Sequence, residues 1–391
     1  MFFHYAEVYQ WLSGGVEAGV EAGVEAGGQL INRSPLYEQQ SALGAQFGLT
    51  EGWEMARSYS GSSEEHLAVR ANAGIVDLSY CGVLKISGGE AVQFLNGLVT
   101  NDVKTLLAGK GMRAAFLTGH GKVRALCRVL SIGEAFLVIN DPQTHHKVLK
   151  YVSPFSYAGD FKVEDVSGQY RALSVQGPKS QLVMKEICFE PVPSLSEYDW
   201  FESLIAGHRA LVSQASHTGE LGYDIFIPAS ALKDVWDFIL LKGQFHSLVP
   251  FGLQALESLR VEAGIPVYGV DIDETNMMLE TGLGDAVSFK KGCYTGQEAV
   301  AMATYRGHVS KKLSGLIVES DTLPKAGTIV KKDAKEIGHI TSSVRSLSLT
   351  ATIALAYLKY GFFEPGATVQ VEAETDSISA LVAELPFYRA L

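Results

Sequence analysis

The stretch from Ser288 to Glu298 holds a thiol, two lysines, two glycines and a carboxylate within eleven residues. The nucleophilic form of a cysteine is its thiolate, and neighbouring cations favour that form. Lys290 and Lys291 would therefore favour a reactive Cys293, which makes Cys293 and Lys291 candidate catalytic residues. A small, inert cysteine packed beside glycines fits the same pattern, so this alternative stays open. We expect a helix to begin at about Thr295, with Thr295 as its cap.

A second polar pair, Asn101-Asp102, stands between the apolar residues Val99 and Val103. Such pairs usually form a turn or a helix cap, because both side chains bond nearby backbone groups. A carboxylate in a partly desolvated cleft can also hold or relay a proton, which makes Asp102 a second kind of catalytic candidate. The pattern by itself favours the turn.

Hydrophobic periodicity indicates which elements position these residues. It predicts a helix over 62–73, a short helix over 90–98 and hairpin strands between 113 and 140. Further strands at 171–175, 209–212 and 217–227, with a helix between, suggest a ferredoxin-like split βαβ unit.

The segment 252–264 reads as an amphipathic helix. Its leucines and Val261 would face the core, and Glu257, Arg260 and Glu262 would face solvent. After Gly307 the pattern changes to short strands separated by glycines and prolines, which is typical of a small antiparallel barrel.

We therefore expect an α+β fold in three parts. Residues 1–40 contain a repeat of Gly-Val-Glu-Ala, in which glycine at every fourth position disfavours a helix, and would form a poorly ordered extension. Residues 41–305 would form the main region with two subdomains, and residues 306–391 the barrel.

Composition restricts the function classes. The net charge is −11 and the pI about 5.4, which argues against direct, sequence-independent binding to nucleic acid. The four cysteines are scattered without a C-x-x-C motif, so we expect no metal site and a reducing compartment. No apolar run reaches the length of a membrane span, and we expect a cytoplasmic protein without membrane contact.

The octet from Lys291 to Glu298 resembles the K-G-C-[aromatic]-x-G-Q-E motif of the YgfZ-type folate-binding proteins and matches it at every position. The resemblance implies a folate-dependent accessory protein that supports assembly or repair of iron–sulfur clusters, and thereby tRNA modification. Cys293 would be the reactive thiol, folate the small-molecule partner, and iron–sulfur enzymes the client proteins. The cofactor would be tetrahydrofolate or a one-carbon derivative of it.

Much of the chain also resembles the glycine-cleavage T-proteins (aminomethyltransferases). Shared segments occur in order at Gly52-Trp53, 64–70, 77–79 and 100–103, and again at Thr218-Gly219-Glu220, 255–264 and in the barrel strands. The resemblance implies a central folate cleft with Asp102 near the folate nitrogen. It implies these folate-contacting residues: Asn101, Asp102, Glu220, Asp224 and Tyr268.

Two positions depart from the T-protein pattern. Asp224 stands where that family carries a glutamate that contacts the pterin, so a carboxylate remains. Leu256 stands where the family carries a substrate-binding arginine, and leucine has no charged donors. Three functions therefore stay open: the iron–sulfur accessory protein, a tetrahydrofolate-dependent aminomethyltransferase, and a non-catalytic folate-binding module.

Overall fold

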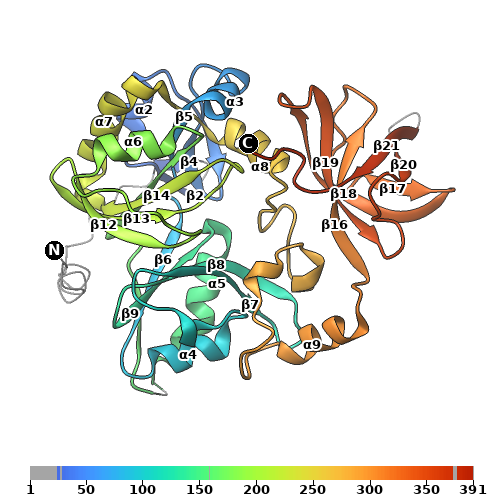
Figure 1. Cartoon of the computed structure of the whole chain (residues 1–391), viewed down its shortest axis with the longest axis horizontal. Helices are drawn as coiled ribbons and strands as arrows, with labels where there is room; N and C mark the ends of the chain where they lie inside the picture. Colours follow the sequence, from blue (N-terminus) through green and yellow to red (C-terminus); the bar gives the residue numbers. More distant parts are fainter. Residues whose placement is uncertain (1–23, 27–28, 158, 373–376, 391) are drawn as a thin grey trace.

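The computed structural model describes residues 24–26, 29–157, 159–372 and 377–390. Two sheet-and-helix lobes form one side of the molecule, and a separate barrel forms the other (Figure 1). The α+β class and the C-terminal barrel predicted from the sequence are confirmed. No helix in this described part of the chain is long and apolar enough to cross a membrane.

The first lobe is built on a six-stranded sheet. In spatial order its strands are β12 (Trp200–Ile205), β13 (His208–Gln214), β14 (Gly222–Pro228), β11 (Tyr170–Gln176), β5 (Ala73–Asp77) and β15 (Leu248–Pro250). Helices α6 (Ser180–Ile187) and α7 (Leu232–Gly243) bury apolar side chains, Trp236 among them, against this sheet. The sheet also contributes Phe226 and Leu211 to a second core, which it shares with the other lobe.

The second lobe is built on a five-stranded antiparallel sheet. Its strands, in spatial order, are β10 (Lys162–Asp165), β6 (Gly82–Ser87), β9 (Ala135–Asn140), β8 (Val123–Ser131) and β7 (Gly111–Leu117). Helices α4 (Ala91–Leu98) and α5 (Pro142–Val152) contribute to the core formed with these strands. Burial alternates along the first part of β8, so Arg124, Leu126 and Arg128 project from the opposite face. That face is turned toward the middle of the molecule, where Leu126 and Arg128 line a cavity.

The barrel is closed and six-stranded. Its strands, in order around the barrel, are β16 (Lys311–Val318), β19 (Ala351–Lys359), β18 (Lys335–Ser346), β17 (Ile329–Lys332), β20 (Thr368–Glu372) and β21 (Ser377–Ala383). Helix α9 (Gln297–Arg306) leads into it. Because the sheet is closed, none of these described strands is left with an unpaired edge of backbone N–H and C=O groups.

Helix α8 (Leu253–Glu262) joins all three parts. Ala255 and Leu259 pack into the core shared by the two lobes, while Val261 packs against barrel residues. The expected solvent face of this helix is wrong for two residues, because Arg260 and Glu262 are buried. Arg260 pairs with Asp271 at 2.6 Å and donates a hydrogen bond to Ser342 of the barrel. Glu262 accepts a hydrogen bond from Ser346 of the barrel. The barrel therefore covers the polar side of the helix.

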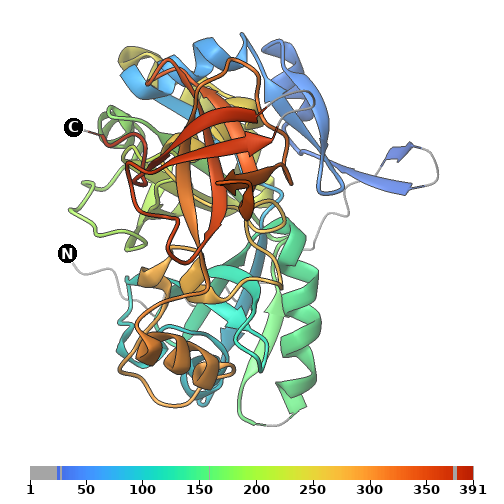
Figure 2. The ribbon, with the colours of Figure 1, turned by 90° about the vertical axis from the view of Figure 1, so that its right-hand side faces the viewer.

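Regular secondary structure begins before residue 41, the expected start of the main folded region. Residues of β1 (Val24–Ala26) and β2 (Gln29–Arg33) form a four-stranded sheet with β4 (Trp53–Ser58) and β3 (Gln46–Thr50). Strands β1 and β2 project from the body in Figure 2, whereas β4 packs against it through buried Met55 and Ala56. Leu36 and Gln40, at α2 (Tyr37–Ala42), are fully buried, so residues expected in the N-terminal extension belong to the folded core. The greater part of the Gly-Val-Glu-Ala repeat lies outside the described residues.

Candidate active site

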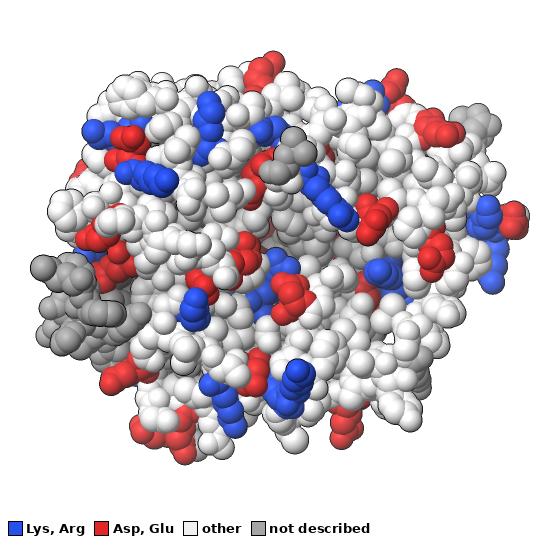
Figure 3. All heavy atoms as spheres, in the orientation of Figure 1, with Lys and Arg blue, Asp and Glu red and all other residues white. Residues whose placement is uncertain are grey.

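A central cleft lies between the two lobes and α8. It consists of a cavity of about 500 Å³ and an adjoining one of about 150 Å³. Both are lined by Cys81, Arg128, Asp141 and His217, so the two cavities share one polar floor. Figure 3 shows a hollow at the middle of this face with side chains of both charges around it.

An ionic cluster forms the floor of the cleft. Asp224, on β14, is fully buried, and its carboxylate accepts hydrogen bonds from Arg128 of β8 and from His217. The His217 Nε2 lies 2.9 and 3.1 Å from the two carboxylate oxygens. Burial alone would raise the pKa of Asp224, but His217 and Arg128 outweigh it, so that pKa lies well below its usual range. Asp224 is therefore an anion held beneath the cleft.

Other polar groups in the cleft are desolvated. Burial raises the pKa of Asp141, and raises the pKa of the Cys81 thiol to about 12 although Arg128 opposes this. Cys81 is therefore a neutral thiol near neutral pH. The Asn140 side chain lines the smaller cavity, and its buried Oδ1 has no hydrogen-bond partner within the described residues.

The Asn101-Asp102 pair lies outside the lining of both cavities but is bonded to a residue that lines the smaller one. The Asn101 amide donates to the carbonyl oxygens of Arg113 (2.9 Å) and Asp285 (3.0 Å), and Arg113 lines the smaller cavity. Asp102 Oδ1 accepts from the Lys104 backbone at 3.2 Å and caps a short 3₁₀ turn. The pair thus makes the turn that its pattern predicts. The other carboxylate oxygen of half-buried Asp102 has no hydrogen-bond partner in the described part of the chain.

Lys291 holds that loop in place. Its ammonium donates to the carbonyl oxygens of Asn96, Val99 and Asn101 at 2.7, 2.8 and 2.7 Å. Burial lowers the pKa of Lys291 to about 8, although Asp102 opposes this. The structure therefore joins Lys291 to the Asn101-Asp102 loop, where the sequence pattern had suggested a charge acting on the neighbouring thiol.

Cys293 is the exposed cysteine of the chain. It lies in the loop before α9, which begins at Gln297 and has Gly296 as its N-cap residue. The expected cap by Thr295 is wrong, because Gly296 adopts a left-handed conformation with φ 84° and no side chain bonds the helix end. The Thr295 hydroxyl instead lies 3.4 Å from the hydroxyl of Tyr151.

None of the five predicted folate-contacting residues lines either cavity, and two of them, Glu220 and Tyr268, are held in other surroundings. Glu220 is buried and paired with Arg70 at 3.0 Å. Tyr268 is buried in a core with Ile272, and burial raises its pKa to about 12. The structure thus brings Lys291 together with Asn101 and Asp102 and buries Asp224 behind Arg128 and His217, with Glu220 and Tyr268 elsewhere.

Arg128 and His217 are site residues that the sequence patterns do not predict. For His217 the signal was its position directly before Thr218-Gly219-Glu220, a segment singled out for another reason. For Arg128 the signal was a basic residue on the alternating face of a predicted strand. Neither pattern shows that both side chains meet one buried carboxylate.

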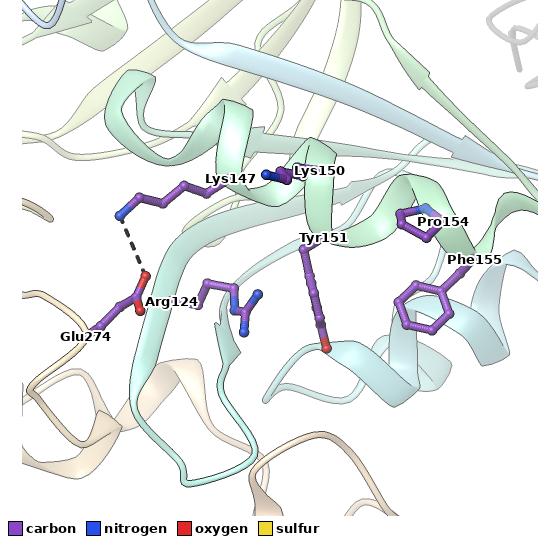
Figure 4. A pocket seen from close by; sticks show the side chains of 7 residues that line it. All are labelled: Arg124, Lys147, Lys150, Tyr151, Pro154, Phe155 and Glu274. Carbon is purple, nitrogen blue, oxygen red and sulfur yellow. Dashed lines mark ion pairs between the residues drawn. The ribbon is translucent and has the colours of Figure 1, made fainter.

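A separate basic groove of about 560 Å³ lies along α5 (Figure 4). The Arg124 guanidinium stacks over the Tyr151 ring at 4.3 Å, and Lys147 lies 3.6 Å from Glu274. Phe155 forms the far side. This groove shares no lining residue with the central cleft. In the described residues no group of His, Cys, Asp or Glu side chains has the arrangement of a metal site.

Comparison with known proteins identifies the family. Residues 36–291 match the GCVT N-terminal domain, and residues 311–389 match the glycine cleavage T-protein C-terminal barrel domain. An aminomethyltransferase of Bacillus subtilis (strain 168) is 30% identical over 362 residues, covering 92% of this chain and 100% of that protein. One from Halothermothrix orenii is 30% identical over 358 residues, covering 91% of this chain and 100% of its own length.

The fold is also found in a solved structure. The glycine cleavage system aminomethyltransferase T of Bartonella henselae superposes with a TM-score of 0.84 at 24% identity, covering 92% of this chain and 98% of that one. Together with the two domain matches and the relatives that align over their full length, this likeness shows that the chain belongs to the glycine cleavage T-protein family.

Proposed function

We propose that this protein is a tetrahydrofolate-dependent aminomethyltransferase. The observation that carries the proposal is the half-buried Asp102 carboxylate, in a loop that Lys291 fixes and that Asn101 bonds to Arg113 in the lining of the smaller cavity. Aminomethyltransferases of its family use tetrahydrofolate. The chain spans the full length of the two relatives described, which bear that activity in their names.

The cleft suits a folate. Its walls carry apolar side chains from α8 and from the segment after it, including Leu253, Leu256, Ile265 and Val267. A flat heterocycle with N–H donors needs such walls together with a few buried acceptors. The partnerless Asn140 Oδ1 and the carboxylate of Asp141 are acceptors of this kind.

When bound, tetrahydrofolate would supply an amine nitrogen that accepts the one-carbon unit. Asp102 would hold a proton at the carboxylate oxygen that has no hydrogen-bond partner in the described residues. Lys291 would act as a positioning residue, because its three bonds fix the loop that carries Asp102. Asp224 would act on the ligand only through Arg128 and His217, since no part of it is exposed.

Leu256, in place of the substrate-binding arginine of the family pattern, is compatible with an aminomethyltransferase that accepts fewer substrates. Leu256 lines the larger cavity and gives that wall an apolar surface. Arg128 lines both cavities, so a cation remains in the cleft without an arginine at position 256. We expect the substrate to contact Arg128 rather than a cation at position 256. This change should narrow the range of one-carbon donors that the protein accepts.

A second candidate function rests on Cys293. This exposed thiol could reach a client protein, as an iron–sulfur accessory role of the YgfZ type would require. The names of the relatives favour aminomethyl transfer over this role. In a non-catalytic folate-binding module Cys293 would be inert packing and its replacement would have no effect.

One pair of assays separates the three candidates. The first measures transfer of an aminomethyl group to tetrahydrofolate by the wild type, Asp102→Asn and Cys293→Ala. The second measures rescue of an iron–sulfur tRNA-modifying enzyme in a bacterium that lacks its YgfZ protein. Transfer that depends on Asp102 and not on Cys293 supports the proposal. Rescue that depends on Cys293, without transfer, supports the accessory role, and folate binding without either supports the module.

A further inference from the structure

His217 has the surroundings of a proton-transferring residue. It lines both cavities of the cleft, and its side chain is 27% exposed. Two contacts fix it in place. Its backbone N–H donates to the side-chain oxygen of buried Gln176 at 3.0 Å, and its ring Nε2 lies on the Asp224 carboxylate.

The buried carboxylate selects one form of the ring. Ionised Asp224 can only accept hydrogen bonds, so the Nε2 of His217 must carry a proton. In the neutral imidazole this leaves Nδ1 as a bare acceptor. No protein group within the described residues bonds Nδ1, and that atom is absent from the buried atoms that lack a partner. Nδ1 is therefore accessible, on a side chain that lines the cleft.

Arg128 keeps the carboxylate charged. It reaches Asp224 from another sheet, so the cluster joins β8, β14 and the loop before β14. Four other titratable groups interact with this cluster: Asp141, Glu197, Cys81 and Tyr198. Arg113 interacts in turn with Asp141 and Glu197. Asp224 thus lies between Arg128 and His217. A carboxylate placed in this way orients the imidazole, as in the catalytic triads of hydrolases.

We propose that His217 accepts a proton at Nδ1 from the ligand bound in the cleft and returns it to the leaving group, with Asp224 and Arg128 as positioning residues. This inference rests on the proposed function. In the transfer, an amine nitrogen of the acceptor forms a bond to the aminomethyl carbon, whose bond to its donor breaks. The N–H proton goes to Nδ1 while its electron pair stays on nitrogen. The imidazolium then protonates the leaving group, which took the electrons of the broken bond.

A purely structural role is the alternative. His217 could serve only to satisfy the buried Asp224 oxygens, and its loss would then affect stability and not proton transfer. The chain offers a matched control in His145, whose Nε2 lies 3.0 Å from Asp165 and which lines neither cavity of the cleft. A His145→Asn variant loses a similar pair without touching the cleft.

The test combines NMR with kinetics on the full chain. In ¹⁵N-histidine spectra, the signal missing from His217→Asn identifies residue 217. We expect the neutral ring to carry its proton on Nε2 and to leave Nδ1 bare, and we expect the signal to move when tetrahydrofolate is added. Protonated Nδ1 in the neutral ring, or a signal that tetrahydrofolate leaves unmoved, would overturn the inference.

In single-turnover transfer, His217→Asn and His217→Gln should slow the reaction about a hundredfold. Each should lose one limb of the pH–rate profile and keep tetrahydrofolate affinity within a few-fold of the wild type. His145→Asn should retain both limbs. If the His217 variants retain both limbs, the inference is wrong. If the wild type transfers nothing, the proposed function fails instead, and the NMR titration alone decides the role of His217.

Discussion

Glu262 offers the most quantitative test of how the barrel is attached. Its fully buried carboxylate accepts bonds from Ser346 and Ser348 of the barrel region and pairs with Arg70 at 2.9 Å. Burial alone would raise the pKa of Glu262, but contacts with His66, Ser346 and Ser348 lower it from 4.5 to about 2. The folded protein therefore prefers the ionised form far more strongly than the unfolded chain does.

This preference has a defined pH window. Between about pH 2 and 4.5 the unfolded chain binds more protons at this position, so stability rises with pH across that window. The depressed pKa corresponds to about 3 kcal/mol of unfolding free energy, present in full above pH 5 and reduced to about 1 kcal/mol at pH 3. Glu262→Gln should therefore lower the unfolding free energy by about 3 kcal/mol at pH 7.

The measurement is urea denaturation of the wild type and Glu262→Gln at pH 7, 5, 4 and 3, followed by tryptophan fluorescence. We expect the difference between the two proteins to shrink by about 2 kcal/mol as the pH falls from 7 to 3. Glu257→Gln, on the same helix but 47% exposed, is the control and should cost less than about 1 kcal/mol at every pH. A pH-independent difference for Glu262→Gln would refute the linkage.

Three further predictions concern the cleft and the octet. Lys291→Met should lower stability by about 2–4 kcal/mol and weaken tetrahydrofolate binding in calorimetry, because three carbonyl groups lose their charged donor; unchanged affinity would remove Lys291 from the site. Cys293 should alkylate before Cys81, Cys127 and Cys188 in peptide mapping at neutral pH, because burial raises the pKa of all three other thiols; faster labelling of Cys81 or Cys127 would contradict this. Asp224→Asn should cost about 3–5 kcal/mol in thermal or urea unfolding, because it leaves the Arg128 charge without its buried partner; a loss below 1 kcal/mol would show that the cluster is not tightly coupled.

The sequence predicts the architecture well where one periodicity dominates. The alternation in 113–140 predicts the strands that became β7, β8 and β9. The short strands after Gly307 predict the barrel in the same way. Helix α8 shows the limit of this approach. Its polar residues Arg260 and Glu262 are covered by the barrel, and no single-helix pattern distinguishes a solvent face from a face that pairs with polar groups of another domain.

The site is harder to predict because its contacts join distant parts of the chain. Lys291 and Cys293 are neighbours in sequence, which suggested that the lysine acts on the thiol. The Lys291 ammonium instead bonds carbonyls about 190 residues earlier in the chain, and so supports the loop of Asp102. Likewise Asp224 lies in an ordinary strand pattern, and only the fold brings Arg128 and His217 onto it.

The central claim is that Asp102 acts in tetrahydrofolate-dependent aminomethyl transfer. We would measure transfer to tetrahydrofolate by the wild type, Asp102→Asn and Asp273→Asn, together with tetrahydrofolate affinity. Asp273 is the matched control, because its carboxylate also accepts a backbone N–H two residues on, at 2.7 Å, and it does not belong to the loop that Lys291 holds. We predict that Asp102→Asn slows transfer at least about a hundredfold, while Asp273→Asn behaves like the wild type. Transfer by Asp102→Asn at the wild-type rate, or no transfer by well-folded wild type, would contradict the claim.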